Sequence, residues 1–163
     1  MFSIGQKIVY KGNGLCIFRG TEEKKMAGHP VSYYLLTPCA RPNSSVLVPC
    51  ANPALVEQMR PMLSKTEAKE LLSYAATAEE RWTESERERT AQFRVLLSEY
   101  DRQGLVRIIR VLHRRKLALA EKSRRLYASD EKMLKEAADL LCVELSEALS
   151  ISSEDAMKQL VEA

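Results

Sequence analysis

The apolar positions in the first fifty residues occur in short runs that are typical of β-strands. These runs are rich in β-branched and aromatic residues. They cover residues 7–10, 15–18, 31–36 and 46–48. Gly12, Asn13 and Gly14 provide a tight turn after the first run, and Gly28 breaks the chain before the third. We therefore expect a small antiparallel sheet of four or five strands that curls into a partly open barrel.

After residue 50 the apolar positions recur every three or four residues, which predicts helices. Each helix start is marked by a capping residue. The expected starts are Asn52, Ser64, Thr77, Asp101 or Gln103, Ser129 and Ser152. The first helix should end near Pro61, the second near Tyr74 and the third near Tyr100. These helices predict one compact bundle over residues 64–163, which follows a sheet domain over residues 1–63.

Two of the expected helices have a clear apolar face. In the helix that starts after Asp101, the apolar face carries Leu105, Ile108, Ile109 and Leu112. The basic residues of this helix fall mostly on its other face; they are Arg107, Arg110, Arg114, Arg115 and Lys116. In the helix that starts at Ser129, the apolar stripe is Met133, Leu134, Ala137, Leu140, Leu141 and Leu145. We expect both apolar faces to be buried in the bundle.

The only tryptophan of the chain, Trp82, stands in a strongly charged stretch, residues 77–89. Thr77 and Glu80 fit a capping box, which predicts that Trp82 lies about one turn inside a helix. Tryptophan is highly buried on average, so one interpretation is that the ring packs this helix onto the preceding domain. The other is that the ring contacts a base or sugar of nucleic acid while neighbouring arginines hold phosphates.

The net charge of +3 conceals an uneven distribution of charge along the chain. Residues 81–125 carry thirteen Lys or Arg against six Asp or Glu, whereas residues 126–163 carry three against nine. A basic segment of this size is typical of a polyanion binder, although a solvated helical surface has the same composition. Nucleic acid is therefore a candidate partner.

Residues that carry catalytic or metal chemistry are few. The two histidines, His29 and His113, belong to no nucleophile motif, and there is no GxSxG motif or phosphate-binding glycine loop. The four cysteines lack the CxxC-type spacing of zinc sites, which suggests small buried residues in a reducing compartment. The N-terminus has charge and glycine where a signal peptide is apolar, and no run of about 18 apolar residues occurs. We expect a cytoplasmic protein that is not an enzyme and has no metal, cofactor or membrane contact.

A further set of positions, spread over almost the full length, has a recognisable order. In the sheet region they are Phe2, Gly5, Val9, Tyr10, Gly14, Ile17, Tyr34, Leu35 and the run Val46-Leu47-Val48-Pro49. In the helical region they are Met59, Arg60, Ser64, Trp82, Arg87, the run Ile108-Ile109-Arg110, residues 129–132 and the pair Leu140-Leu141. Together they resemble the CarD/CdnL family of bacterial transcription regulators. The sheet region resembles the RNA-polymerase-interacting domain that this family shares with the transcription-repair coupling factor.

The resemblance implies an α+β protein in which a Tudor-like or SH3-like antiparallel barrel docks on the β subunit of bacterial RNA polymerase. The helical bundle would then contact promoter DNA weakly and with little sequence specificity. In the family, a tryptophan wedges into the minor groove at the upstream edge of the melted −10 region and stabilises the open complex. The resemblance implies this role for Trp82. The protein would work as a monomer that is associated with the nucleoid through polymerase.

The resemblance also implies residues for each contact. On the DNA side, Trp82 would be accompanied by Arg81, Arg87, Arg114, Arg115, Lys116 and Lys132. Some relatives have basic residues where this chain has Glu84 and Ser85, so phosphate contacts here would either be fewer or be supplied by the run from Arg114 to Lys116. On the polymerase side, the implied residues are Lys24, Tyr10 and Leu47. Some relatives have an arginine at the position of Leu47.

The residues alone leave an alternative function open. In it the sheet domain binds a protein partner, the helical bundle is a scaffold, and Trp82 is buried. Fluorescence separates the two, because a buried indole emits at shorter wavelength and resists aqueous quenchers.

Overall fold

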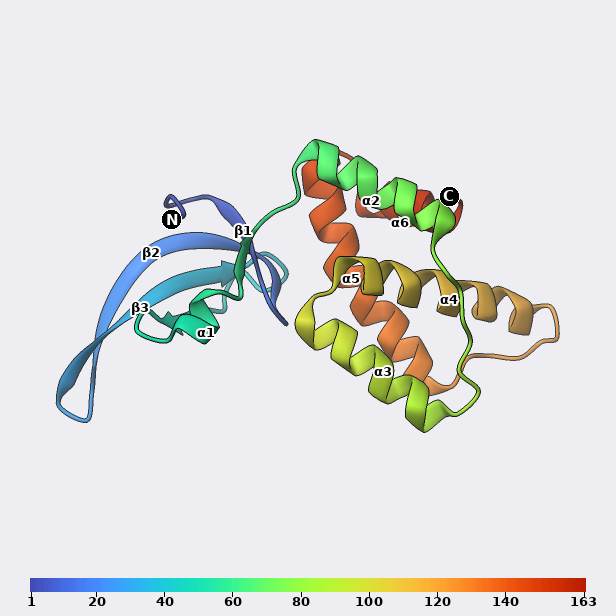
Figure 1. The fold of residues 1–163 in the computed structure, drawn as a ribbon, viewed down its shortest axis with the longest axis horizontal. Coiled ribbons are helices and arrows are strands. Elements are labelled where there is room, and N and C mark those ends of the chain that lie inside the picture. Colours follow the sequence, from blue (N-terminus) through green and yellow to red (C-terminus); the bar gives the residue numbers. More distant parts are fainter. The chain divides into compact units, whose positions relative to one another are not determined.

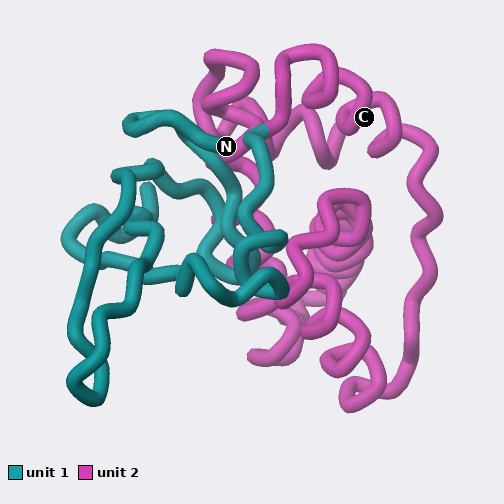
Figure 2. Tube along the Cα trace, turned by 60° about the vertical axis from the view of Figure 1, so that its left-hand side comes forward, with its two compact units in different colours: residues 1–62 teal, residues 63–163 magenta.

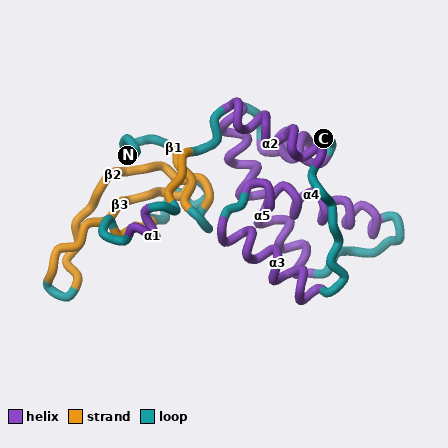
Figure 3. Tube along the Cα trace, in the orientation of Figure 1, coloured by secondary structure: helices purple, strands orange, loops and turns teal.

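The computed structural model describes all residues from Met1 to Ala163, and the chain is an α+β protein (Figure 1). It divides into two compact units, Met1–Met62 and Leu63–Ala163, which Figure 2 shows in different colours. Strands occur only in the first unit, and all helices except one short turn occur in the second (Figure 3). Each unit has its own hydrophobic core.

The first unit is a five-stranded antiparallel sheet in the order β4-β3-β2-β1-β5. The strands are β1 (Lys7–Tyr10), β2 (Gly14–Met26), β3 (His29–Pro38), β4 (Val46–Pro49) and β5 (Met59–Pro61). The four strands predicted from the apolar runs are confirmed. The sheet is open, because β4 and β5 form its two edges and do not pair with each other, so a closed barrel is not formed.

All five strands contribute to the core of the first unit. The buried residues are Ile8, Cys16, Phe18, Leu36, Val48 and Met59. The Phe18 ring is central, because its centroid lies 6.0 Å from that of Phe2 and 5.8 Å from that of Tyr34. The pairing of β2 with β3 shifts register between Phe18 and Thr21, where Gly20 has a φ of +102°. From Thr21 to its end, β2 leaves the core and is exposed.

The chain after β4 differs from the sequence prediction. Asn52 caps α1 (Pro53–Val56) as predicted, but this helix does not continue to Pro61. Residues Met59–Pro61 instead form β5, which pairs with β1. Pairing with a distant strand therefore outweighs the local helical signal, and a proline at the end of an edge strand is compatible with the ladder.

The second unit is an all-α bundle. Its helices are α2 (Lys65–Thr77), α3 (Glu86–Glu99), α4 (Arg102–Ala120), α5 (Ala128–Leu149) and α6 (Ser153–Val161). α4 packs against all of the other four helices, and Figure 1 shows it crossing α5. Leu105, Ile108, Ile109 and Leu112 are fully buried, which confirms the apolar face predicted for this helix.

Three predicted helix starts in this unit are confirmed by side-chain caps. Ser64 and Glu67 form a reciprocal capping box: Ser64 Oγ accepts from Glu67 N at 3.1 Å, and Glu67 Oε1 accepts from Ser64 N at 3.0 Å. Hydrogen bonds from the backbone and side chain of Ser64 to the Glu67 carboxylate lower the pKa of Glu67, because they favour its charged form. Asp101 and Ser152 cap α4 and α6 with one side-chain bond each: Asp101 Oδ1 accepts from Gly104 N at 2.9 Å, and Ser152 Oγ accepts from Asp155 N at 3.0 Å.

The predicted start at Thr77 is wrong. Thr77 is the last residue of α2, and α3 begins after Ser85, whose Oγ accepts from Glu88 N at 3.3 Å. The sequence has the same Ser/Thr-x-x-Glu spacing at both places, and only the second begins a helix. Trp82 therefore lies in an irregular segment between two helices.

Two expectations for α5 are also wrong. Tyr127 occupies the N-cap position, and Ser129 lies in the first turn, where its Oγ donates to Glu86 Oε1 at 2.6 Å. Leu140, expected in the buried stripe, is only half-buried, whereas Glu144 is fully buried. The buried face of α5 thus includes an acid that the apolar pattern does not mark.

Candidate nucleic-acid interface

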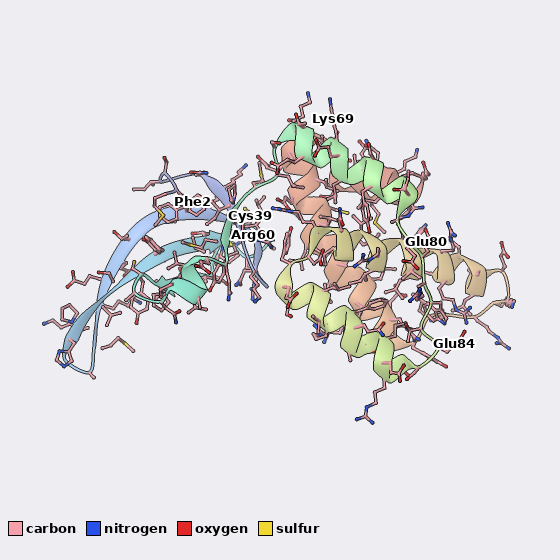
Figure 4. All side chains as sticks on the ribbon, viewed as in Figure 1. Phe2, Cys39, Arg60, Lys69, Glu80 and Glu84 are labelled. Carbon is pink, nitrogen blue, oxygen red and sulfur yellow. The ribbon has the colours of Figure 1, made fainter.

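Residues 78–85, which include Trp82, connect α2 to α3 without regular structure, and Figure 1 shows this connection passing α4. Glu80, which is labelled in Figure 4, ties this segment to α4. Its Oε1 accepts from Arg110 Nε at 3.0 Å, and its Oε2 lies 2.5 Å from Arg114 Nη1. Because Arg110 and Arg114 are four residues apart, one turn of α4 presents both guanidinium groups to the same carboxylate.

Arg110 was expected on the exposed face of α4, and this expectation is wrong. The residue is buried, with 8% of its surface exposed, and its Nη1 donates to Leu160 O at 2.7 Å. It therefore satisfies a carbonyl near the end of α6 as well as Glu80. Such a buried arginine has a structural role and is not available to a ligand.

Arg89 fixes the other end of the segment. It is 1% exposed and makes two hydrogen bonds to Asp130, at 2.9 Å from Nε and 2.6 Å from Nη2. Its Nη1 donates to Thr83 O at 2.7 Å and to Glu84 O at 3.3 Å. Figure 4 shows Glu84 near the start of α3. A two-pronged arginine–carboxylate pair is rigid, so it holds the backbone on both sides of the bend before α3.

Trp82 lies between these two anchor points and is half-buried. The guanidinium carbon of Arg89 is 4.1 Å from the centroid of the Trp82 ring, and that of Arg115 is 4.9 Å from it. Both distances are within the range of cation–π attraction. The Nε1–H of Trp82 is buried and has no hydrogen-bond acceptor, which is unusual because buried indoles generally have a partner.

A pocket of about 180 Å³ opens beside this ring. Its lining includes Trp82, Arg115, Leu119, Arg124, Arg125 and Asp130. The turn after α4 places the two later arginines: Ser123 has a φ of +56°, its N–H bonds Ala120 O, and Arg124 N bonds Leu119 O at 2.8 Å. These two bonds form a Schellman motif, which gives the turn one defined backbone shape. The arginines after the turn thus start from fixed backbone positions.

The pocket gathers most of the unpaired arginines of the helical unit. Four arginines of this unit have no hydrogen bond or ion pair from the guanidinium group: Arg87, Arg115, Arg124 and Arg125. All four are exposed, and only Arg87 lies outside the lining. Asp130 is the only acid in the lining, and both of its oxygens are bound by Arg89. The pocket is therefore strongly cationic.

The residues predicted for DNA contact fall into three groups. Trp82 and Arg115 are brought together, whereas Arg87 is exposed in the first turn of α3. The others already have acidic partners: Arg81 with Glu79, Arg114 with Glu80, Lys116 with Glu131 and Lys132 with Glu136. The basic member of each pair is exposed, but Glu80 is only 11% exposed, so the Arg114 pair is partly buried. The other three pairs lie nearer the surface, where ion pairs contribute little free energy, so a phosphate can replace those acidic partners at small cost.

Sequence reasoning missed four residues of this site: Arg89, Arg124, Arg125 and Asp130. Arg89 lies in the charged stretch around Trp82, and Asp130 lies in the family-like run of residues 129–132, but neither was singled out as part of a site. Their pairing joins positions 41 residues apart, which local spacing does not reveal. Arg124 and Arg125 did have a signal, because they are adjacent basic residues at the end of the basic segment.

The residues predicted for polymerase contact lie on three strands. Lys24 is exposed on β2, Leu47 is half-buried on β4, and Tyr10 is half-buried at the end of β1. Lys24 and Leu47 face positions on β3 that are four residues apart, about 13 Å along that strand. Tyr10 packs against the core of the sheet unit. The structure therefore does not gather the three into one cluster.

Titratable groups elsewhere are explained by packing. Burial raises the pKa of the Cys16 thiol to about 12 and that of the Cys142 thiol to about 11, so both are protonated at neutral pH. Burial, and to a smaller extent Lys116, lowers the pKa of His113. No group of three or more His, Cys, Asp or Glu is placed to hold a metal ion. None of the helices is both long and apolar enough to cross a membrane.

The chain thus combines an open antiparallel sheet with a helical bundle that carries a cationic aromatic pocket. Residues 2–63 match the family model of the CarD-like/TRCF RID domain. The first unit is therefore a CarD-like RNA-polymerase-interacting domain, and domains of this family interact with the β subunit of RNA polymerase. The helical unit lies outside the matched residues. A comparison of the chain with curated proteins gave no match.

Proposed function

We propose that the first unit docks on the β subunit of bacterial RNA polymerase and that the helical unit then stabilises the promoter open complex. The observation that carries this proposal is the match of residues 2–63 to a polymerase-interacting domain. In this proposal the open sheet is a Tudor-like fold and the protein is a regulator with no catalytic role. It works as a monomer in the cytoplasm, associated with the nucleoid through polymerase.

Trp82 is the residue proposed to act on DNA, as a wedge at the upstream edge of the melted −10 region. Unstacking a base step costs a few kcal/mol, so insertion of an aromatic ring gives the largest net stabilisation where the step is already distorted. The ring therefore favours melted over closed DNA, and a difference of about 1.4 kcal/mol changes that equilibrium tenfold. Arg115 lies over the ring without an acidic partner, so it can turn to a phosphate and uncover the ring for a base.

Attachment to polymerase compensates for weak DNA binding by the protein itself. Docking converts DNA contact into an intramolecular event with a high effective concentration. No helix of the bundle is needed in the major groove for this role, so we expect little sequence specificity. The proposed phosphate contacts come from Arg115 and from the exposed basic residues Arg81, Arg87, Arg114, Lys116 and Lys132.

A second candidate function is favoured by the environment of Trp82. The ring is half-buried, Arg89 lies 4.1 Å from its centroid, and its Nε1 is buried. These contacts also suit a purely structural anchor. In that case the protein is an interaction module whose helical bundle is a scaffold without a direct DNA role.

The proposal predicts how DNA binding depends on polymerase. Alone, the protein should bind a short promoter duplex weakly, with a dissociation constant of about 10⁻⁶–10⁻⁴ M in physiological salt. Added salt should weaken this binding further. With polymerase present, the same concentration of protein should raise the fraction of open promoter. Fluorescence anisotropy of the duplex and a fluorescent base in the melted region measure the two quantities. Nanomolar binding by the free protein would contradict attachment through polymerase, and an unchanged open fraction would contradict the function.

A further inference from the structure

The pocket beside Trp82 has a combination of charge, size and shape that points to a specific ligand. Its cations are Arg115, from the last part of α4, and Arg124 and Arg125, from the turn that follows. None of the three guanidinium groups has an acidic partner. Like charges around one small cavity repel each other, and the repulsion is relieved most by an anion with more than one negative charge.

The acids around the pocket do not neutralise it. Asp130 lines the pocket, but both oxygens accept hydrogen bonds from the buried Arg89. Glu131 lines a neighbouring cavity that Arg124 and Arg125 also line, but its carboxylate is paired with Lys116 at 2.8 Å. The positive charge of the three arginines is therefore left for a ligand.

The walls make the pocket a defined site. The Schellman motif at Ser123 sets the backbone from which Arg124 and Arg125 extend, and Leu119 provides an apolar side. Trp82 provides a flat aromatic wall, and its Nε1–H has no acceptor. Guanidinium groups form paired, planar hydrogen bonds with phosphate oxygens, so arginine suits this ligand better than lysine.

The volume limits what fits. About 180 Å³ is below the usual range of about 300–1,000 Å³ for pockets that enclose a drug-sized molecule. A phosphate or pyrophosphate group fits, whereas a whole nucleotide would have to leave its base and sugar outside. We propose that this pocket binds a phosphate group, provided either by the DNA backbone or by a free pyrophosphate-type anion. The DNA source rests on the proposed function, whereas the free anion does not.

The test uses the full-length protein and sodium pyrophosphate. Trp82 is the only tryptophan and forms one wall, so its emission should change saturably on titration at constant ionic strength. Calorimetry gives the same dissociation constant without relying on fluorescence. In the double variant Arg124→Gln/Arg125→Gln, both methods should give binding at least about tenfold weaker, because two charge-assisted contacts are lost. The substituted side chains are exposed and unpaired, and circular dichroism confirms that the variant is folded.

Lys122→Gln is the matched control, because Lys122 is an exposed cation in the same turn but outside the pocket lining, and it has no role in the proposed DNA contact. This variant should bind pyrophosphate as the wild type does. The proposal is overturned if wild type shows no saturable binding by either method, or if the Lys122 variant loses as much affinity as the double variant.

Duplex DNA, added at low salt to the pyrophosphate complex, separates the two sources of phosphate. Displacement of pyrophosphate supports a pocket that also holds the DNA backbone. If duplex DNA does not displace pyrophosphate, the pocket is a site for a free anion. In that case the pocket does not contribute a phosphate contact to the proposed DNA function. The experiment therefore distinguishes a failure of the proposed DNA function from a failure of the proposed phosphate site.

Discussion

Replacing Glu144 with alanine should lower the free energy of unfolding of the helical unit by about 3–5 kcal/mol. Glu144 is fully buried, and its carboxylate accepts from Arg102 Nε at 2.9 Å and Arg102 Nη2 at 2.7 Å. It also accepts from Tyr100 Oη at 3.0 Å and from Leu63 N at 2.8 Å. Alanine removes this acceptor from all of these donors; Tyr100 Oη retains Leu140 O at 3.2 Å, and each buried group left unsatisfied has its own cost. Urea denaturation followed by Trp82 fluorescence measures the change in this unit alone.

Asp139→Ala is the control for Glu144. Asp139 is an exposed acid on the same helix, and it pairs with Lys135 at 2.8 Å. Exposed pairs four residues apart contribute little, so this variant should unfold at nearly the same urea concentration as the wild type. The prediction would be contradicted if both variants lost the same free energy of unfolding, because burial of Glu144 would then make no difference.

Asp130→Ala should lower the free energy of unfolding about as much as Glu144→Ala does, and it should also change the surroundings of Trp82. Removing this carboxylate leaves the Arg89 guanidinium buried without a counter-charge, which costs about 3–5 kcal/mol. Because Arg89 also holds Thr83 O and lies over Trp82, the segment between α2 and α3 should loosen. We expect Trp82 emission at longer wavelength and faster quenching by iodide in the native state.

Two comparisons make the Asp130 prediction specific. The double variant Arg89→Met/Asp130→Leu removes both charges together, so its loss of stability should be smaller than the sum of the two single losses. Glu131→Ala breaks the neighbouring half-exposed pair with Lys116 and should cost at most about 1 kcal/mol. The prediction would be contradicted if the loss of stability in the double variant equalled the sum of the two single losses. It would also be contradicted if Asp130→Ala left the quenching of Trp82 unchanged.

The sequence was a good guide where a local signal acts alone. The capping box of Ser64 and Glu67 begins α2, and the apolar face of Leu105 and Ile108 is buried in α4. Both depend on neighbours within one or two turns, which is the range that periodicity and capping patterns describe.

The sequence was a poor guide where contacts between distant positions decide the structure. Thr77 with Glu80 fits a capping box, but the Glu80 carboxylate pairs with Arg110 and Arg114 on α4, so no helix begins there. Likewise, Met59–Pro61 forms a strand because β1 is available as a partner. Buried polar pairs combine two such distant positions, and an apolar pattern does not mark them.

The candidate site was predicted in part for the same reason. The sequence drew attention to Trp82 and to the basic segment around it, and the structure brings Arg115 to the ring. It did not show that Arg124 and Arg125 meet Trp82 in one pocket, because a left-handed residue at Ser123 sets that turn. Left-handed conformations are mostly adopted by glycine, so the sequence gives little warning of one at serine.

The most direct test of the account compares wild-type protein with Trp82→Ala in promoter opening by bacterial RNA polymerase. A fluorescent base in the melted region reports the open fraction and its lifetime after a competitor is added. We predict that wild type prolongs the open complex, whereas the folded variant binds polymerase equally well and has lost most of this effect. Equal open-complex lifetimes with the two proteins, at equal occupancy of polymerase, would contradict the account and leave Trp82 with a structural role only.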